Sequence, residues 1–249
     1  MAGRKILFVA TSHAELGATG HRTGLWMEEL AAPYFALRDA DPDMDITLAS
    51  IRGGAIPFDP RSLPAEAGQA GGEQPGAGEV PATVRRFLAD PRAMEAARVS
   101  VPVDEVAGRL FDALLLPGGH GAMWDMPGSA ELAHMVGLHL DEDRVVAAVC
   151  HGPAGLVSAK RLDGRPVVEG LRVTCFTNTE EAAVGLAEVV PFLLEDRLKE
   201  LGGWFGRGPD WHPFAVREGN LITGQNPQSS ELLARYVLEA LGIGAPAPR

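Results

Sequence analysis

Three short runs of mostly apolar residues, each ended by glycine or polar residues, constrain the fold of this chain most strongly. They cover residues 5–11, 111–116 and 144–149, and none shows a regular alternation of polar and apolar side chains. A strand of this kind is buried on both faces, as in a parallel sheet that helices cover on both sides. Further strands are expected at 45–50 and 172–176, with a hairpin at 214–223.

Helical patterns separate these strands, and the first of them contains Pro33, which we expect to bend or divide it. The alternation predicts an α/β fold. Residues 1–249 are expected to form a single doubly wound domain, whose mostly parallel sheet has helices on both faces, as in a flavodoxin-like sandwich. The expected helices are residues 23–38, 84–97, 129–140, 154–160, 178–201, with a break at Pro191, and 226–242.

The segment 64–82 differs in composition from the rest of the chain. Thirteen of its 19 residues are Gly, Ala or Pro, and none is aromatic. Such a segment buries too little apolar surface to offset the entropy that it would lose on ordering. We therefore expect a mobile surface insertion within the domain.

The balance of charges is acidic, with 22 basic and 33 acidic residues and a formal net charge of −11. This charge disfavours sequence-independent binding to nucleic acid and docking on anionic membranes. No apolar run approaches the ~18 residues that a spanning helix needs. Two cysteines are too few for a disulfide framework, so a reducing, cytoplasmic location is expected.

Cys150 occupies the most informative position. The apolar strand 144–149 runs into the tight turn Cys-His-Gly-Pro at 150–153, and a helical pattern follows. This is the layout of a nucleophile elbow, which exposes a side chain at the carboxyl edge of the sheet. A helix N-terminus beyond it favours the thiolate, so we expect a lowered pKa for Cys150. The alternative, a small buried core residue, is our interpretation of Cys175, which lies inside a strand pattern.

A second turn, Pro-Gly-Gly-His-Gly at 117–121, follows another strand. Its glycines let backbone N–H groups approach a ligand, so one of them could form an oxyanion hole with the N–H of His151, although tight turns need the same glycines. No suitable G-x-G-x-x-G dinucleotide fingerprint occurs. His134 and His139 lack the i, i+4 spacing of metal ligands on one helix face, so no metal site is expected.

Two carboxyl groups are candidates for acid–base work. Glu29 has large apolar neighbours at i−4, i−3 and i+4, which would raise its pKa, whereas Glu28 lies nearer the polar side. The ordinary alternative is a partly solvated helix glutamate. Glu181 lies near the start of a predicted helix, beside Glu180. One of these two glutamates suits the helix terminus, and the other could orient a histidine base.

These motifs together resemble the ThiJ/PfpI superfamily, which has the class I glutamine-amidotransferase-like fold. Within it they are similar to the glyoxalase III-like, heat-shock-chaperone-like branch. The resemblance spans nearly the whole chain outside 64–82. It is carried by residues 23–29, 117–125, 147–153, 176–181, 191–196 and 223–230.

The resemblance implies roles for individual residues. Cys150 matches the family nucleophile, and Glu29 matches the helix glutamate whose protonated carboxyl contacts that sulfur. His151 matches the adjacent histidine, and Glu181 matches the acid that pairs with it. Similar proteins tend to have glycine at the position of Cys175, which is a departure from the family pattern.

The resemblance also implies a reaction. Gly119, together with the neighbouring His120, matches the turn that binds the oxyanion and the substrate. The implied activity is a glutathione-independent conversion of methylglyoxal or a similar 2-oxoaldehyde into a 2-hydroxy acid. It needs no cofactor, because the reacting sulfur is internal, and the implied assembly is a homodimer.

Two other functions stay open. The first is another cysteine-nucleophile enzyme, such as an amidase, a peptidase or a protein deglycase. The second is a holdase chaperone whose cysteine senses redox conditions. A small closed pocket at Cys150 would favour the glyoxalase over a peptidase, and large exposed apolar patches would favour the chaperone.

Overall fold

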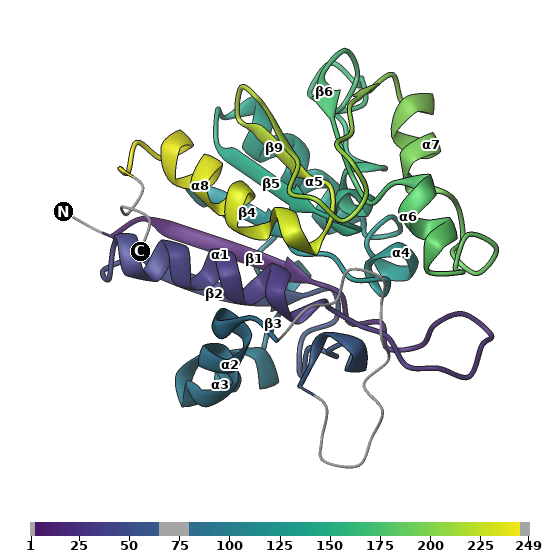
Figure 1. Cartoon of the computed structure of the whole chain (residues 1–249). Helices are drawn as coiled ribbons and strands as arrows, with labels where there is room; N and C mark the ends of the chain where they lie inside the picture. Colours follow the sequence, from purple (N-terminus) through teal and green to yellow (C-terminus); the bar gives the residue numbers. More distant parts are fainter. Residues whose placement is uncertain (1–2, 65–79, 245–249) are drawn as a thin grey trace.

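A seven-stranded sheet forms the centre of the computed structural model, which describes residues 3–64 and 80–244 (Figure 1). Its spatial order is β3-β2-β1-β4-β5-β9-β8, and every neighbouring pair is parallel except β8 and β9. The strands are β1 (Lys5–Ala10), β2 (Asp45–Ser50), β3 (Val101–Pro102), β4 (Ala113–Leu116), β5 (Val145–Val149), β8 (Ala215–Glu218) and β9 (Leu221–Gly224).

The sheet is buried on both faces, as the apolar runs predict. Ile6 and Phe8 of β1 pack in one core with the helices α1, α2, α3 and α8, whereas Leu7 and Val9 pack in a second core with α4, α5 and α7. In Figure 1, α1 and α8 lie in front of the sheet. The helices are α1 (Met27–Ala40), α2 (Ala82–Ala89), α3 (Pro91–Arg98), α4 (Ala122–Asp125), α5 (Ala130–Asp141), α6 (Asn178–Ala183), α7 (Leu194–Glu200) and α8 (Ser230–Ala240). The predicted doubly wound α/β fold is therefore confirmed.

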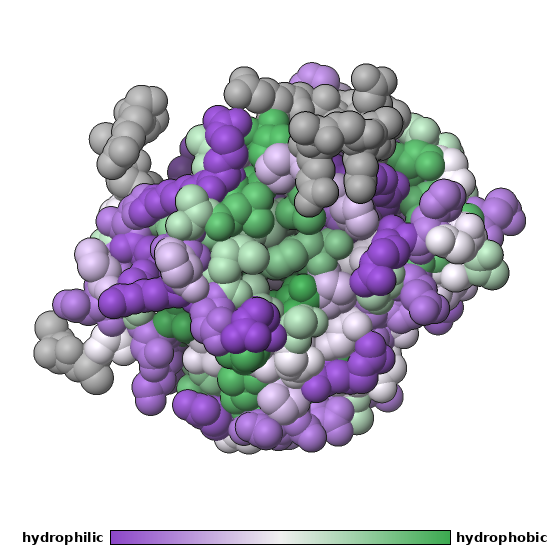
Figure 2. All heavy atoms as spheres, turned by 90° about the horizontal axis from the view of Figure 1, so that it is seen from below, coloured by the Kyte–Doolittle hydropathy of each residue, from purple (hydrophilic) through white to green (hydrophobic). Residues whose placement is uncertain are grey.

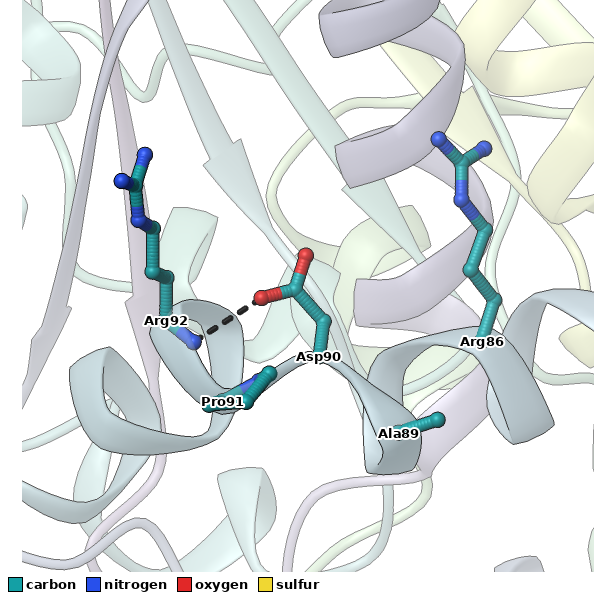
Figure 3. A pocket seen from close by; sticks show the side chains of 5 residues that line it. All are labelled: Arg86, Ala89, Asp90, Pro91 and Arg92. Carbon is teal, nitrogen blue, oxygen red and sulfur yellow. Dashed lines mark hydrogen bonds between the residues drawn. The ribbon is translucent and has the colours of Figure 1, made fainter.

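The helix predicted at 84–97 is wrong, because two helices meet there at Asp90 and Pro91. The Asp90 carboxylate accepts hydrogen bonds from the backbone N–H groups of Arg92 and Ala93, at 2.9 and 3.1 Å, and so caps α3. Figure 3 shows this junction, with Arg86 and Arg92 on either side. Proline at the first helical position and aspartate before it are ordinary helix-start signals, and here they end α2.

Pro33 was expected to bend or divide the first helix; the division is wrong, and the bend stays a prediction. The helix α1 runs without interruption from Met27 to Ala40, and Leu30, Pro33 and Leu37 are all buried. The helix packs against the sheet and against α2 and α8. This packing stabilises it on both sides of Pro33, which lacks a backbone N–H group.

The strand predicted at 172–176 is short and lies outside the main sheet. Only β6 (Arg172–Val173) is a strand, and it pairs with β7 (Trp204–Phe205) in a separate two-stranded sheet. The segment 178–201 forms two helices, α6 and α7, as the predicted break at Pro191 implies, but the break is longer than expected and covers residues 184–193. Gly185 in this break has a φ of 73°, which an α-helix cannot accommodate.

The predicted insertion 64–82 falls mostly on residues 65–79, which lie outside the described residues, and Ala82 already belongs to α2. The single domain with a mobile insertion therefore stays a prediction. Figure 2 shows the face that carries α2 and α3, where apolar side chains gather between charged ones. A shallow cavity of about 250 Å³ beside α3 is lined by Ile56, Phe58 and Met94, among others. Among the described helices, none is long and apolar enough to cross a membrane.

Candidate active site

Cys150 lies in the turn directly after β5, at the carboxyl edge of the sheet. Its φ is 58°, in the left-handed region that is uncommon for residues other than glycine. Two backbone hydrogen bonds of 2.9 Å hold it: its N–H donates to the Gly224 carbonyl, and its carbonyl accepts from the Phe176 N–H. The backbone turn of the predicted elbow is therefore present, but the exposure that this layout led us to expect is wrong, because Cys150 is only 3% exposed. The helix predicted at 154–160 is instead a 3₁₀ helix, η3 (Gly152–Leu156).

The turns after β4 and β5 lie against each other, and glycine makes this possible. A Cβ atom on Gly118 would lie 2.5 Å from the His151 nitrogen, and one on Gly152 would lie 1.9 Å from the Leu116 carbonyl oxygen. Both distances are far below van der Waals contact. The two glycines therefore allow the segment 117–121 to approach the cysteine turn directly.

A hydrogen-bonded series connects Cys150 to His151 and Glu181. The Cys150 Sγ lies 3.3 Å from His151 Nδ1, and His151 Nε2 lies 2.7 Å from Glu181 Oε2. The helix α6 presents Glu181 to the site, and a capping box between Thr177 and Glu180 fixes the start of that helix. Burial alone would raise the pKa of Glu181, but the two imidazoles that contact it hold that pKa below its ordinary value.

His120 is a second histidine on the same carboxylate. Its Nε2 lies 2.8 Å from Glu181 Oε1, and its ring centroid lies 4.1 Å from that of His151. Its Nδ1 lies 3.4 Å from Arg61 Nη2. Burial lowers the pKa of His120 to about 4, and the charges of His151 and Arg61 act in the same direction. The structure thus brings His120 to the site with protein partners on both ring nitrogens.

Glu29 reaches the site from α1 and is 1% exposed. Its Oε2 accepts a 2.7 Å hydrogen bond from the Gly118 N–H, whereas its Oε1 has no hydrogen bond of good geometry to any described residue. Burial raises the pKa of Glu29 well above its ordinary value, and interactions with the Cys150 thiol and the Gly118 N–H oppose this rise. A carboxyl in this setting favours its protonated form.

The thiol of Cys150 does not have the lowered pKa that the sequence led us to expect. Burial raises the pKa of Cys150, the negative charge of Glu29 raises it further, and the Gly119 N–H opposes the rise. The short 3₁₀ helix beyond the turn provides little helix dipole. A proton on Glu29 removes the repulsive charge and supplies a donor to the sulfur, so the two groups are linked in their protonation.

Cys175 is fully buried, as we predicted. Its thiol donates to the Phe176 carbonyl at 3.2 Å, and burial raises its pKa well above the ordinary value. Its surroundings differ from those of Cys150, because its thiol is hydrogen-bonded to a backbone carbonyl, whereas the Cys150 sulfur contacts an imidazole.

Among the described residues, one group of three side chains has the donor atoms and the spacing to hold a metal ion. His120, His151 and Glu181 offer ligand atoms that lie within 4.8 Å of one another. In this arrangement each imidazole Nε2 is hydrogen-bonded to one oxygen of Glu181, so the three donors satisfy one another.

Sequence reasoning missed three contributors to the site. Phe176 packs against both imidazoles, with ring centroids 4.6 Å from His151 and 5.9 Å from His120. Asp59, which is buried, and Arg61, which is partly exposed, form an ion pair of 2.8 Å, and Arg61 reaches His120 from η1 (Pro60–Ser62). Aspartate before proline signals a helix start, but nothing in the sequence places this segment at the sheet edge.

Comparison with known proteins gives one family match. The model of the DJ-1/PfpI family matches residues 92–240. Among curated relatives, the chain is 29% identical to "Glutathione-independent glyoxalase hsp3101" of Schizosaccharomyces pombe, over 94% of this chain and 95% of that protein. It is 31% identical to "Probable glutathione-independent glyoxalase hsp3103" of the same organism, over 89% and 92%.

A solved structure supports the fold over its full length. The chain is similar to Francisella tularensis Rapid Encystment Protein 24 KDa, with 34% identity and a TM-score of 0.86. The match covers 96% of this chain and 99% of that one. Relatives and solved structure alike therefore extend over nearly the whole sequence.

Proposed function

This chain belongs to the DJ-1/PfpI family, and we propose that it is a glutathione-independent glyoxalase that converts methylglyoxal or a similar 2-oxoaldehyde into a 2-hydroxy acid. Two curated relatives that match nearly its full length carry that activity in their names, one of them as probable. The observation that carries the proposal is the meeting of Cys150, Glu29 and His151 in one buried site. This reaction needs a nucleophile that attacks the aldehyde carbon and an acid–base group that reaches the hydrogen on that carbon.

The proposed reaction begins with proton transfer from the Cys150 thiol to His151, which Glu181 holds in place. The thiolate adds to the aldehyde carbon and forms a hemithioacetal. The N–H groups of Gly119 and His151 stabilise the oxyanion, and protonated Glu29 then supplies a proton to it. This step leaves Glu29 ionised in apolar surroundings, where it is a strong base.

The second stage moves a hydrogen from C1 to C2 of the substrate. The Glu29 carboxylate removes the C1 proton while the imidazolium of His151 protonates the C2 oxygen, which gives an enediol and returns His151 to its neutral form. Glu29 then delivers its proton to C2 and takes the proton of the C1 hydroxyl group, so that its carboxyl is again protonated. The product is a thioester of Cys150 with the 2-hydroxy acid. Water, deprotonated by His151, then hydrolyses the thioester and regenerates the thiol. The substrate is oxidised at C1 and reduced at C2, so no external oxidant or reductant is required.

The direct test is consumption of methylglyoxal by purified protein in the absence of glutathione, with lactate as the measured product. The Cys150→Ala variant is the negative control, and Cys175→Ala is the matched variant of the other cysteine. Lactate from the wild type and from Cys175→Ala, but not from Cys150→Ala, is the expected result. Equal activity in all three proteins would contradict the proposal.

A second candidate is hydrolysis of amides or esters, which the series Cys150–His151–Glu181 also favours. The same three residue types activate the nucleophile in cysteine hydrolases. Glu29 has no role in that chemistry. Small amide and ester substrates therefore distinguish the two functions: a hydrolase would cleave them as fast in Glu29→Gln as in the wild type.

Homodimer formation, which the resemblance implies, remains part of the proposal. Light scattering after size-exclusion chromatography would measure it, and the expected mass is twice that of the 26.3 kDa chain.

A further inference from the structure

His120 and Arg61 form an outer part of the hydrogen-bonded network that the proposed reaction does not use. Starting from the sulfur, the network runs through His151 and Glu181 to the Nε2 of His120. It continues from His120 Nδ1 to Arg61, at 3.4 Å, and ends at the Asp59 carboxylate.

We propose that Arg61 fixes the tautomer of His120, and that His120 is a positioning residue that keeps Glu181 directed at His151. A guanidinium has only donors, so the ring nitrogen beside it must be an acceptor and carry no proton. The proton of neutral His120 is therefore on Nε2, where it donates to Glu181 Oε1 at 2.8 Å. The inference concerns the state of the network, and its effect on turnover rests on the proposed function.

Arg61 is suited to this role because its own position is fixed. Its Nε and Nη2 bind the two oxygens of Asp59 at 3.0 and 2.8 Å, and the Asp59 side chain is buried. Thr23 donates to the same carboxylate at 2.9 Å. A bidentate pair of this kind holds the guanidinium in one plane, so it cannot turn away from His120.

The consequence is an unequal division of roles between two histidines that contact one carboxylate. The charged and titratable groups that face His120 are Glu181 from α6, His151 from the cysteine turn, and Arg61 with Asp59 from the η1 segment. With Arg61 beside Nδ1, His120 cannot accept a second proton there. The proton released by Cys150 therefore goes to His151, and both oxygens of Glu181 accept from imidazole N–H groups.

The first experiment measures the tautomer directly. Protein with ¹⁵N-labelled histidine is studied by long-range ¹H–¹⁵N correlation spectra, and His120→Gln identifies the His120 signals. The expected result is a neutral His120 ring with its proton on Nε2 from pH 5.5 to 8. A proton on Nδ1, or a doubly protonated ring at pH 7, would overturn the inference. In Arg61→Met the doubly protonated ring should appear at a higher pH than in the wild type, because one of the charges that disfavour it is removed, whereas in Arg98→Met this pH should not change. Arg98 is the matched control, because it also binds a carboxylate in a bidentate way, on the exposed surface.

The second experiment measures the consequence for Cys150. His120→Leu removes the donor to Glu181, and His120→Gln can replace it. We expect His120→Leu to lower both the rate of thiol alkylation by iodoacetamide and kcat for methylglyoxal by about tenfold or more, with KM within about threefold of wild type. His120→Gln should recover most of both losses. His139→Gln, at another buried histidine with two hydrogen bonds, controls for lost packing.

Wild-type alkylation and turnover in His120→Leu would refute the positioning role. So would a loss in His120→Gln as large as that in His120→Leu, because packing alone would then explain both. If His120→Leu does not fold, the tautomer in the wild type still decides the inference. If the wild type consumes no methylglyoxal, the proposed function fails, while the tautomer and the alkylation rates still test the network.

Discussion

The Gly118 N–H donates a 2.7 Å hydrogen bond to Glu29 Oε2, and this bond joins the turn after β4 to the first helix. The other carboxyl oxygen, Oε1, has no hydrogen bond to a described residue and is available for interactions within the site. The orientation of Glu29 is therefore set by backbone and does not depend on the substrate. A residue with a fixed orientation and a raised pKa is well suited to repeated proton transfer.

Replacing Glu29 by glutamine should separate thiol reactivity from turnover. Glutamine keeps the shape of the side chain and can donate a hydrogen bond, but it cannot release or accept a proton. We expect kcat for methylglyoxal to fall at least ~100-fold, while iodoacetamide still alkylates Cys150. Glu28→Gln, one position along α1, is the matched control and should turn over normally. Normal turnover in Glu29→Gln would assign the proton transfers to His151.

Replacing Cys150 by alanine should abolish turnover and leave the fold intact, because a thiol in a turn fills little core volume. Cys175→Ala should keep most of the activity, since that side chain only packs and donates to a backbone carbonyl. Lactate formation and circular dichroism check the two variants together. An equal loss of activity in both would remove the distinction between the two cysteines.

Glu181→Gln should lower kcat by ~100-fold or more, by analogy with loss of the orienting carboxylate in other nucleophile–histidine–acid sites. Glutamine has one acceptor oxygen where the site presents two imidazole donors, so one of the two hydrogen bonds is lost. Steady-state kinetics measure the change, and Glu188→Gln, on the exposed surface, is the control. Turnover near wild type would show that His151 needs no orienting acid.

Gly118→Ala should damage the site through the backbone. The added Cβ would lie 2.5 Å from the His151 nitrogen and 2.6 Å from the Val149 carbonyl oxygen, so the two turns must separate. We expect a loss of about 1–3 kcal/mol in unfolding free energy and a fall in turnover. Gly108→Ala is the matched control, because nothing lies within 4 Å of its added Cβ. Denaturant titration and methylglyoxal turnover would show whether the two alanine variants differ.

Glu28 should make stability depend on pH. Burial and the charge of Glu231 raise its pKa to about 7 in the folded protein, above the value of 4.5 expected when unfolded. The folded state then holds more protons between these values, so stability falls as pH rises from 4.5 to 7. Glu28→Gln should therefore raise the unfolding free energy at pH 8 by up to about 2 kcal/mol, and change it little at pH 4. Urea titrations at the two pH values check the sign.

Local signals were sufficient to predict much of this fold. The apolar runs located β1, β4 and β5, because burial on both faces leaves a continuous pattern. Ser129, the expected start of one helix, is the N-cap of α5, whereas Asn226 caps the 3₁₀ helix η4 (Pro227–Ser229) and α8 begins only at Ser230. The break at Asp90 and Pro91 carried equally clear signals, and the longer helical pattern around it hid them.

The electrostatics of the site could not be predicted in the same way. The sequence placed Cys150 in a turn, but the direction of its pKa depends on burial and on Glu29, which is 121 residues away. The contact of His120 with Glu181 depends on how α6 is oriented by its capping box and on the turn after β4. Such contacts depend on how elements that are far apart in the sequence pack together. A local residue pattern does not determine that packing.

The parallel pairing of β1 with β4 and of β4 with β5 has a consequence for how the protein acquires its chemistry. Glu29, Gly118, Cys150 and Glu181 meet only after both pairings have closed, and contacts of such long sequence separation form slowly. In a partly folded chain Cys150 would be an ordinary thiol. The appearance of its specific reactivity during refolding would therefore report completion of the central sheet, and shorter fragments of the chain would not possess it.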